Sequence, residues 1–349
     1  MMHISRSVEA LYAQESIHTI RDCLRIVQEN AERVALVMSG DILVGTITDG
    51  DIRRALLAGY TLEDTCSGIC NREYKRVSNK ESELVSVSRV ILVTEGINQL
   101  PIVDEECRIK GLISRMPMRG SDYRAVIMAG GKGTRLRPWT EDCPKPMLPV
   151  GGKPMIDHLI SNLRDCGFRH VYVSVNYLKE KIIDHLGDGH KYGVNIEYLE
   201  EERELGTGGS LQLLDDAISD ILVVNGDVVS DVDYAAIMDF HLENEAFATM
   251  GVSIHKTQIP YGVVNIVNDT VTGITEKPTM TNFINAGIYV ISRGVLDNLE
   301  EDESIDLPSL IMRSSKDLDR DVSVFPIHEF WLDAGDPKTL DAARRYHTV

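Results

Sequence analysis

The sequence predicts an α/β protein in which a mostly parallel sheet follows a smaller α+β part, and three observations predict this fold. The chain has 349 residues, which corresponds to about two domains of roughly 150 residues each. After residue 122, short apolar runs of buried-strand type alternate with helical stretches, as is typical of a parallel sheet covered on both faces. Before it, a strand–turn–strand pattern occurs twice. We therefore expect two domains, residues 1–119 and 120–349, with 116–121 as the linker.

The first part contains two copies of one pattern. In residues 35–60 the apolar runs ALVM and ILVGTI are separated by a turn and followed by the helical run IRRALLAG, which stops at Gly59. The first copy includes the motif GTITDGD at residues 45–51. A looser copy, with the runs LPIVD and IKGLIS, lies at residues 99–114. The second copy repeats the strand–turn–strand pattern about 65 residues later.

This repeat resembles a tandem pair of CBS domains (a Bateman module) over about residues 5–118. The resemblance implies that Thr48 and Asp51 hold the ribose and phosphate of an adenine nucleotide. In the second copy Pro117 replaces the aspartate, so at most one site is complete. A dimerising module without a ligand is the alternative. Asp51 would serve as a helix-capping carboxylate with or without a nucleotide.

The second part is predicted to be the parallel sheet. Its apolar runs AVIMA, VYVSV, ILVVN and ATMGVSI occupy residues 125–129, 171–175, 221–225 and 248–254. A helix is expected over residues 155–166, between the first two strands. Ligands of such sheets bind beyond the carboxyl ends of the strands, so the residues that follow each run are the first candidates for a site.

The charge of the chain argues against a nucleic-acid partner. The net charge is −18, from 36 basic and 54 acidic residues, whereas phosphate backbones need a basic surface. Residues 1–119 hold 15 basic and 17 acidic residues, and residues 120–349 hold 21 and 37. Within the acidic second part, five basic residues lie close together, at Lys132, Arg135, Arg137, Lys145 and Lys153. They predict a site for a small anion.

Composition also predicts where the protein works. The six cysteines are scattered and form no metal-ligand spacing, which fits a reducing compartment. No apolar run approaches the roughly 20 residues that span a bilayer, and the N-terminus does not resemble a secretory signal. We expect a cytoplasmic protein without a membrane partner. The acidic runs at residues 200–202 and 300–303 are interpreted as solvated faces.

A glycine-rich loop follows the first predicted strand of the second part, with the sequence AGGKGTRLRP from Ala129 to Pro138. Such a turn lets backbone N–H groups approach phosphate oxygens, and Lys132 and Arg135 add positive charge. The spacing fits neither a Walker A motif nor a dinucleotide-binding fingerprint. Five prolines lie within 17 residues of the loop and favour a stiff, extended segment that positions Lys145.

The stretch MAGGKGTRLRPWTEDCPKPMLPVGGKPMI, from Met128 to Ile156, resembles the signature of the sugar-1-phosphate nucleotidylyltransferases. The resemblance extends over residues 122–349 and implies a Rossmann-like, mostly parallel sheet of the GT-A type. It also implies that the glycine loop binds a nucleotide, that Arg135 and Lys145 contact its phosphates, and that both stabilise the departing pyrophosphate. The residues of the loop so assigned are Ala129, Gly130, Gly131, Gly133 and Thr134.

Two aspartates are implied to be magnesium ligands by the same resemblance. Asp227 ends the segment NGD at residues 225–227, and Asp333 stands in WLDAG at residues 331–335. Two carboxylates completed by water and phosphate oxygens suit Mg²⁺, which rarely has an all-protein cage. Taken alone, either aspartate would be read as a cap or turn residue, and the motifs favour the metal role.

Base and sugar recognition are implied by further segments. ELGTGGS at residues 204–210 resembles the base-recognition loop, in which Gly206 admits the flat base and Thr207 bonds near it. The segments YG at residues 261–262, EKP at residues 276–278 and NAG at residues 285–287 resemble the family's sugar-binding elements. This resemblance implies that Lys277 holds the sugar phosphate. The other implied contacts of these elements are Tyr261, Gly262, Glu276, Asn285 and Gly287.

A CBS pair joined to this transferase resembles the glucosamine-1-phosphate guanylyltransferases of bacterial legionaminic acid pathways. The expected substrates are therefore GTP and glucosamine 1-phosphate, with GDP-glucosamine and pyrophosphate as products. Mannose or heptose 1-phosphate, and UTP or CTP, are the alternatives. A nucleotide sensor without turnover is the alternative of another class. CBS pairs commonly associate in twos, so a homo-oligomer is expected.

Overall fold

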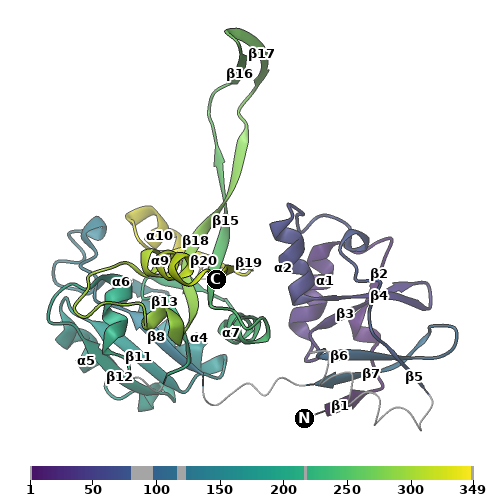
Figure 1. Ribbon diagram of the computed structural model, residues 1–349, viewed down its shortest axis with the longest axis horizontal. Helices are drawn as coiled ribbons and strands as arrows, with labels where there is room; N and C mark the ends of the chain where they lie inside the picture. Colours follow the sequence, from purple (N-terminus) through teal and green to yellow (C-terminus); the bar gives the residue numbers. More distant parts are fainter. Residues whose placement is uncertain (1, 80–96, 116–122, 216–217, 347–349) are drawn as a thin grey trace. The chain divides into compact units, whose positions relative to one another are not determined.

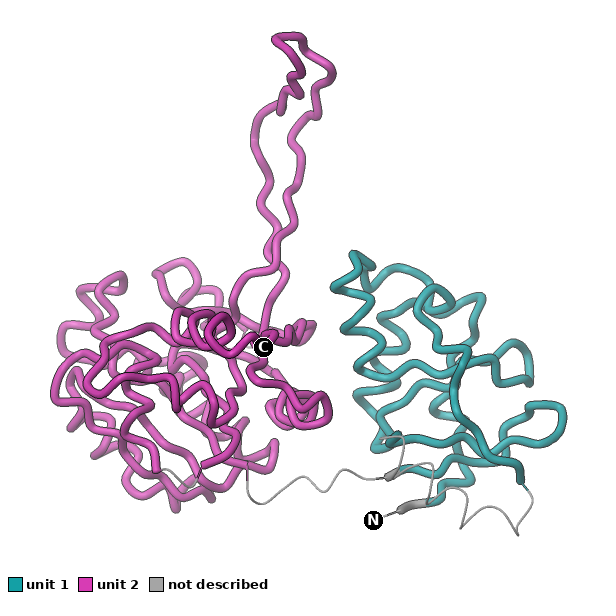
Figure 2. The backbone as a smooth tube through the Cα atoms, viewed as in Figure 1, with its two compact units in different colours: residues 1–119 teal, residues 120–349 magenta. Residues whose placement is uncertain are grey.

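The computed structural model describes residues 2–79, 97–115, 123–215 and 218–346. It divides into two compact units, residues 1–119 and 120–349 (Figure 2). Within the described ranges, no helix combines the length and apolar character needed to cross a membrane. Each unit has its own hydrophobic core, and each is considered by itself below.

The described residues of unit 1 form two small sheets and two helices (Figure 1). The three-stranded sheet has the order β2-β3-β4, with β2 at Tyr12–Gln14, β3 at Val34–Ser39 and β4 at Ile42–Thr48. The four-stranded sheet has the order β1-β7-β6-β5, with β1 at Met2–Ser5, β7 at Ile109–Arg115, β6 at Gln99–Val103 and β5 at Val77–Ser78. The helices are α1 at Ile20–Glu29 and α2 at Asp49–Leu57, with the short 3₁₀ helices η1 at Glu9–Leu11 and η2 at Cys66–Gly68.

The predicted strand–turn–strand pattern is present in both copies. β3, β4 and α2 form the first copy, and β6 with β7 forms the strands of the second. Leu36 and Met38 of β3 share a buried cluster with Val103 and Leu112 of the second copy, so the two sheets pack together. Pro117 and the predicted linker at residues 116–121 lie outside the described residues.

Thr48 and Asp51 form a capping box at the start of α2. The backbone and the hydroxyl of Thr48 both donate to Asp51 Oδ2, at 2.8 and 2.7 Å. The amide of Asp51 donates in return to Thr48 Oγ1, at 3.4 Å. This arrangement satisfies backbone groups that a helix end leaves unpaired. The capping role of Asp51 is thus visible in the structure, and a nucleotide on the same two residues stays a prediction.

Unit 2 is built around a seven-stranded sheet with the order β12-β11-β8-β13-β18-β15-β19. Its strands are β8 at Arg124–Met128, β11 at His170–Val175, β12 at Asn195–Glu200, β13 at Asp220–Asn225, β15 at Ala248–Gln258, β18 at Thr279–Ser292 and β19 at Val322–Ile327. β8 pairs in parallel with β11 and β13, and only β18 among the seven runs antiparallel to its neighbours in the described sheet. The predicted mostly parallel sheet is confirmed.

Helices and two short ribbons surround this sheet, and a third ribbon lies at the tip of the extended β15 and β18 (Figure 1). The helices are α4 at Met155–Asp165, α5 at Lys179–Leu186, α6 at Gly206–Gly209, α7 at Tyr234–Glu243, α8 at Arg293–Leu296, α9 at Leu307–Leu318 and α10 at Pro337–Tyr346. The ribbons pair β9 at Pro149–Val150 with β10 at Lys153–Pro154, β14 at Val228–Ser230 with β20 at Trp331–Asp333, and β16 at Val263–Val267 with β17 at Thr270–Thr275. Single 3₁₀ turns are η3 at Thr134–Leu136, η4 at Lys145–Met147, η5 at His190–Tyr192 and η6 at Ser210–Leu213.

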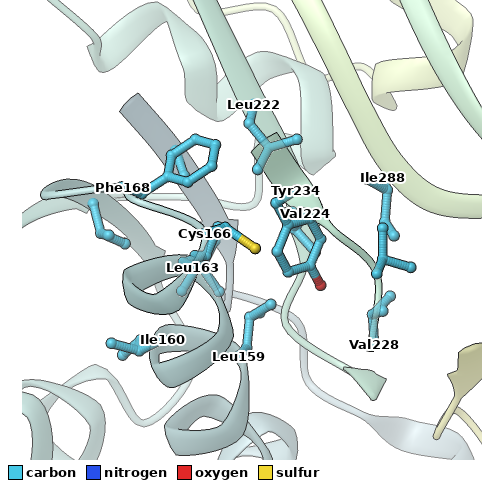
Figure 3. Packing of buried hydrophobic residues seen from close by; sticks show 14 of the residues in the cluster. Leu159, Ile160, Leu163, Cys166, Phe168, Leu222, Val224, Val228, Tyr234 and Ile288 are labelled. Atoms are coloured by element: carbon cyan, nitrogen blue, oxygen red, sulfur yellow. The ribbon is translucent and has the colours of Figure 1, made fainter. Parts of the chain in front are cut away.

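Both faces of the central strands are buried, which explains their unbroken apolar runs. Leu222 and Val224 of β13 point into one core, which contains Leu159 and Leu163 of α4 (Figure 3). Ile221 and Val223 of the same strand belong to a second core, on the opposite face, with Leu307 and Leu310 of α9. Successive side chains of a strand alternate between the faces, so one hydrophobic run serves two cores.

Candidate active site

A cavity of about 510 Å³ opens at the carboxyl ends of the parallel strands. Segments that leave β8, β12 and β13 all contribute to its wall, as expected for a sheet of this type. The predicted nucleotide-binding residues are all among its lining, together with two predicted catalytic residues and one predicted metal ligand. These are Ala129, Gly130, Gly131, Gly133, Thr134, Gly206, Thr207, Arg135, Lys145 and Asp227. Tertiary structure therefore brings together residues that are up to 98 positions apart in the chain.

Glycine is required at two positions of the loop after β8. Gly133 has a φ of +58°, in the left-handed region, and a Cβ there would lie 3.0 Å from the Cβ of Lys145. A Cβ at Gly130 would lie 2.9 Å from Glu201 Oε1 on the opposite wall. The Thr140 hydroxyl donates to the Gly133 carbonyl at 2.8 Å and holds the turn. The loop thus packs closely against the groups that would meet a phosphate or a base.

Lys145 and Asp227 form an ion pair in the wall of the cavity. Their side chains are only 11% and 18% exposed. Lys145 begins the 3₁₀ turn η4 directly after Pro144, and Pro146 also lines the cavity. The proline-rich segment therefore holds the ammonium group at a defined place, as its composition predicts.

Asp333 lies beside Asp227 through the antiparallel pairing of β14 with β20. Asp333 is paired with Val228, and the amide of Ala334 donates to the Asp227 carbonyl at 3.0 Å. Burial, and then the negative charge of Asp227, raises the pKa of the Asp333 carboxyl. Its Oδ1 is buried and has no hydrogen-bond partner among the described residues. A buried acceptor without a partner costs free energy, and a cation bound there would remove that cost.

The two carboxylates fit a divalent cation. Oxygen ligands suit hard cations, and the unpartnered oxygen of Asp333 offers one. Among the described residues, no cluster of three His, Cys, Asp or Glu could hold a metal. Water and phosphate oxygens would therefore complete the coordination. Arg135 lies close to Asp333, because both side chains border Gly335. A Cβ on Gly335 would be 3.0 Å from Arg135 Nη2 and 2.7 Å from Asp333 Oδ1.

The loop at residues 204–210 is fastened to the segment before α9. The amides of Gly208 and Gly209 donate to the Ile305 carbonyl at 2.8 and 3.1 Å. A Cβ at Gly206, whose φ is +74°, would lie 2.7 Å from the same carbonyl oxygen. Thr207 Oγ1 accepts from the amide of Leu307 at 2.9 Å, which leaves its hydroxyl hydrogen for a ligand. Close approach of the two backbones explains the glycines.

Glu201 is a cavity residue that the sequence analysis missed. It lies in the acidic run interpreted as solvated, yet its Oε1 accepts from the Ser174 hydroxyl at 2.6 Å and its Oε2 from the Leu205 amide at 3.1 Å. Its position directly after β12 is the signal that would have found it, because cavity residues follow the parallel strands. Each carboxylate oxygen can accept more than one hydrogen bond, so both can still accept one from a ligand.

The predicted sugar-binding residues fall into two groups. Gly287 lies against the cavity, because a Cβ there would be 2.6 Å from Nδ2 of Asn225, which lines it. Asn285 is nearby and accepts from the Gly287 amide at 3.0 Å.

The other group lies on a ribbon outside the cavity lining. The amide of Lys277 donates to the Tyr261 carbonyl at 3.3 Å, and a Cβ at Gly262 would be 3.0 Å from Glu276 Oε1. Tyr261 is 73% exposed. The structure therefore gathers these four residues next to one another, and their sugar contacts stay predictions.

Comparison with known proteins gives two family matches. A family described as "Nucleotidyl transferase" matches residues 124–348, and one described as "CBS domain" matches residues 8–58. Both resemblances noted in the sequence are thereby confirmed, the second over the first copy of the repeat.

Individual relatives match the second unit. The mannose-1-phosphate guanylyltransferase of Mycobacterium tuberculosis is 35% identical over 224 residues, which are 61% of this chain and 61% of that protein. The mannose-1-phosphate guanyltransferase of Yarrowia lipolytica is 35% identical over 228 residues, 62% of this chain and 61% of that protein. The chain thus spans about three fifths of the length of these curated relatives.

A solved structure has the same fold. HddC from Yersinia pseudotuberculosis gives a TM-score of 0.51 at 28% identity, over 64% of this chain and 99% of that one. A second structure of HddC, complexed with GMP-PN, gives a TM-score of 0.50 at 26% identity, with the same coverage of both chains.

Proposed function

Because the chain belongs to the nucleotidyl transferase family, we propose that it transfers a nucleoside monophosphate from a nucleoside triphosphate to a sugar 1-phosphate. Pyrophosphate is the second product. The observation that carries this proposal is the single cavity wall that combines the glycine loop, Arg135, Lys145 and Asp227. Glycines admit phosphates, and the two cations balance their charge.

The transfer needs no protein nucleophile. An oxygen of the sugar phosphate, already an anion, attacks the α-phosphorus of the triphosphate in line; an O–P bond forms while the bond from that phosphorus to the β-phosphate oxygen breaks. The electron pair leaves with pyrophosphate. Arg135 and Lys145 neutralise the charge on the phosphates, and the glycine loop aligns them. Lys277 is proposed to hold the sugar phosphate.

Asp227 and Asp333 are proposed to hold a divalent cation, Mg²⁺ in the first instance. When bound, the cation would supply charge neutralisation on the triphosphate oxygens. Lys145 pairs with Asp227, so that one carboxylate of the two is already neutralised by this chain. Within the described part of the chain, Asp333 Oδ1 has no hydrogen-bond partner, so Asp333 would gain most from the ion.

Guanine is the proposed base, for two reasons. Both curated relatives described above are named for guanylyl transfer. Within this chain, Glu201 presents a carboxylate in the cavity, between the glycine loop and the loop that carries Gly206 and Thr207. Guanine carries two adjacent N–H donors, which a carboxylate accepts together. Uracil, cytosine and adenine lack this pair of donors, so Glu201 would favour GTP.

Glu201→Gln is expected to lower kcat/KM for GTP about 10- to 100-fold, because one hydrogen bond to a charged group contributes about 1.5–3 kcal/mol. The amide keeps the size of the side chain and replaces one acceptor oxygen by a donor. Activity with UTP or ATP should change less, so the ratio of kcat/KM for GTP to that for the other nucleotides should fall. The exposed neighbour Glu202→Gln is the matched control. If Glu201→Gln kept the wild-type ratio of activity with GTP to activity with UTP or ATP, Glu201 would not be the residue that selects guanine.

Mannose 1-phosphate is the proposed acceptor, because the relatives named above act on it. Glucosamine 1-phosphate is the second candidate, from the combination of a CBS domain with this transferase. An adenine nucleotide on unit 1 is proposed as a regulator. Identical kinetics with and without AMP or ATP would remove that role.

The test of the function is pyrophosphate release by the purified chain with Mg²⁺. GTP, UTP, CTP, dTTP and ATP are each combined with mannose, glucosamine, glucose and N-acetylglucosamine 1-phosphates. Release with GTP and one hexose phosphate is expected. Release with another base corrects the donor and retains the reaction. Nucleotide binding without release in every combination would instead support a nucleotide sensor.

A further inference from the structure

One ribbon of unit 2 extends beyond the sheet, and we call residues 254–283 the arm. β15 and β18 pair from Ala248↔Ile291 to Gln258↔Thr279, with a register shift between Met250 and Val252. Their outer halves continue past the sheet and carry β16 and β17 at the tip (Figure 1). The inner halves are buried, whereas β15 is exposed from Ile254 onward and β18 up to Phe283. The arm therefore has few neighbours beyond its own two strands.

The arm carries an unusual share of exposed apolar side chains. Nine of the 21 large hydrophobic residues that are exposed in the described chain lie within its 30 residues. They are Ile254, Tyr261, Val264, Ile266, Val267, Val271, Ile274, Met280 and Phe283. A two-stranded ribbon is marginally stable in water, and a concentration of exposed apolar side chains on such a ribbon favours an interaction site.

The backbone of the arm also has open edges. Pairing of β15 with β19 ends at Ser253, and pairing of β18 with β13 begins at Ile288. Between these points the described chain supplies no further strand to either outer edge. Such edges present unpaired N–H and C=O groups, which a strand of another chain can satisfy.

We propose that the arm of one chain docks on a second copy of this chain and there brings Lys277 and Glu276 to the cavity of that copy. This proposal rests on the proposed function. A second copy fits the size of the surface: at roughly 100 Å² per large side chain, nine residues offer about 900 Å², and a standard interface buries about 800 Å² per partner.

Charge also favours a second copy. The arm holds two basic residues, Lys256 and Lys277, and two acidic ones, Asp269 and Glu276, so its formal charge is zero in a chain of net charge −18. Contact between two copies through strongly acidic surfaces would be opposed by repulsion. The neutral, apolar arm is a part of this chain that can meet another copy without that cost.

The cavity has few positive charges for the phosphates that it is proposed to bind, and the arm carries one more, on Lys277. Four acidic residues and two basic ones line the cavity, and one of the two, Lys145, is paired with Asp227. A triphosphate and a sugar phosphate bring more negative charge to the same place, so a further cation is needed. Lys277 has a φ of +46°, a region that residues other than glycine rarely adopt and that often marks functional positions.

Complementation between inactive chains tests the proposal. Arg135→Ala, at an exposed cavity residue, inactivates the site of its own chain and leaves its arm intact. Lys277→Ala inactivates the arm and leaves the site intact. The two are co-expressed with different tags, and mixed pairs are isolated by purification on both tags. Each variant alone is expected to lose about 100-fold in turnover, whereas mixed pairs regain about half of the wild-type activity because one complete site remains in each pair.

Other results would overturn the proposal. Mixed pairs as inactive as either variant would show that each arm serves its own cavity. Full activity of Lys277→Ala alone would overturn the proposal because Lys277 would then not be needed at either cavity. Failure to isolate any mixed pair of these two variants would overturn it as well. An unaltered chain that releases no pyrophosphate with any substrate is a different failure, that of the proposed function, and is recognised before the variants are made.

The docking surface is tested in the same mixed pair. Ile266 and Val271 face each other across β16 and β17, so Ile266→Lys with Val271→Glu removes apolar surface and keeps an attractive cross-strand pair. Placed in the Arg135→Ala chain, this change is expected to abolish complementation or the mixed pair itself. Met312→Lys, on α9 and similarly exposed, is the control and should retain it. Full complementation with the altered tip would exclude the arm surface as the contact.

Discussion

Asp227→Ala is expected to lower kcat about 10²–10³-fold, the scale of losing one preorganised charge contact to a transition state. The substitution removes one of the two adjacent carboxylates and leaves Lys145 without its ionic partner. Turnover is measured as pyrophosphate release over a range of Mg²⁺ concentrations. The concentration of Mg²⁺ needed for half-maximal rate should rise as well.

Two comparisons make the result of Asp227→Ala specific. Asp184→Ala removes an exposed carboxylate on α5 and should leave the rate unchanged. Asp333→Ala should resemble Asp227→Ala, and the double variant should lose little more than either single one, because residues that act as a unit are not additive. Near-normal turnover of Asp227→Ala would refute its assignment as a metal ligand.

Gly226→Ala is expected to lower kcat about 100-fold, because displacements near 1 Å at a reacting centre cost about that much. A Cβ at this position would lie 2.7 Å from the Met128 carbonyl oxygen, which accepts from the Gly226 amide at 2.9 Å, and 3.2 Å from Cγ of Pro146. Backbone cannot yield as a flexible side chain can, so β8 and β13 must separate locally. That movement displaces Asp227 and Lys145 together.

The folding of Gly226→Ala is measured beside its kinetics. Overpacking typically costs about 1–3 kcal/mol, so thermal unfolding should occur at a lower temperature while the protein still folds. Gly50→Ala, in α2, is the control, since the three atoms nearest to its Cβ would be side-chain atoms of Arg54 and Thr48, the nearest being Arg54 Nη1 at 3.3 Å. Unchanged kcat in Gly226→Ala would mean that the ends of β8 and β13 are less rigid than their contacts indicate.

Local periodicity predicted much of the second unit. The four apolar runs became β8, β11, β13 and β15, and the helix expected at residues 155–166 became α4. These elements are predictable because burial on both faces requires an unbroken apolar strand, which is visible in a few consecutive residues. The glycine loop was equally visible, since its motif is local.

The antiparallel course of β18 and the length of the arm were not predicted. Pairing direction and the point at which a ribbon leaves a sheet depend on neighbours that come from elsewhere in the chain. The outer part of β15 has the composition of an ordinary strand. Nothing within it therefore indicates that its pairing with β19 stops at Ser253, halfway along β15.

The sequence by itself determined four strands of the sheet, the glycine loop and the identities of the charged residues, because each depends on neighbours within a few positions. Tertiary structure alone decided which of them meet. Asp227 and Asp333 are brought together by the pairing of β14 with β20, and Glu201 enters the cavity because β12 ends at the same edge as β8. Contacts of this kind depend on how the whole sheet packs. The sequence of a single segment does not reveal which distant segment it will contact.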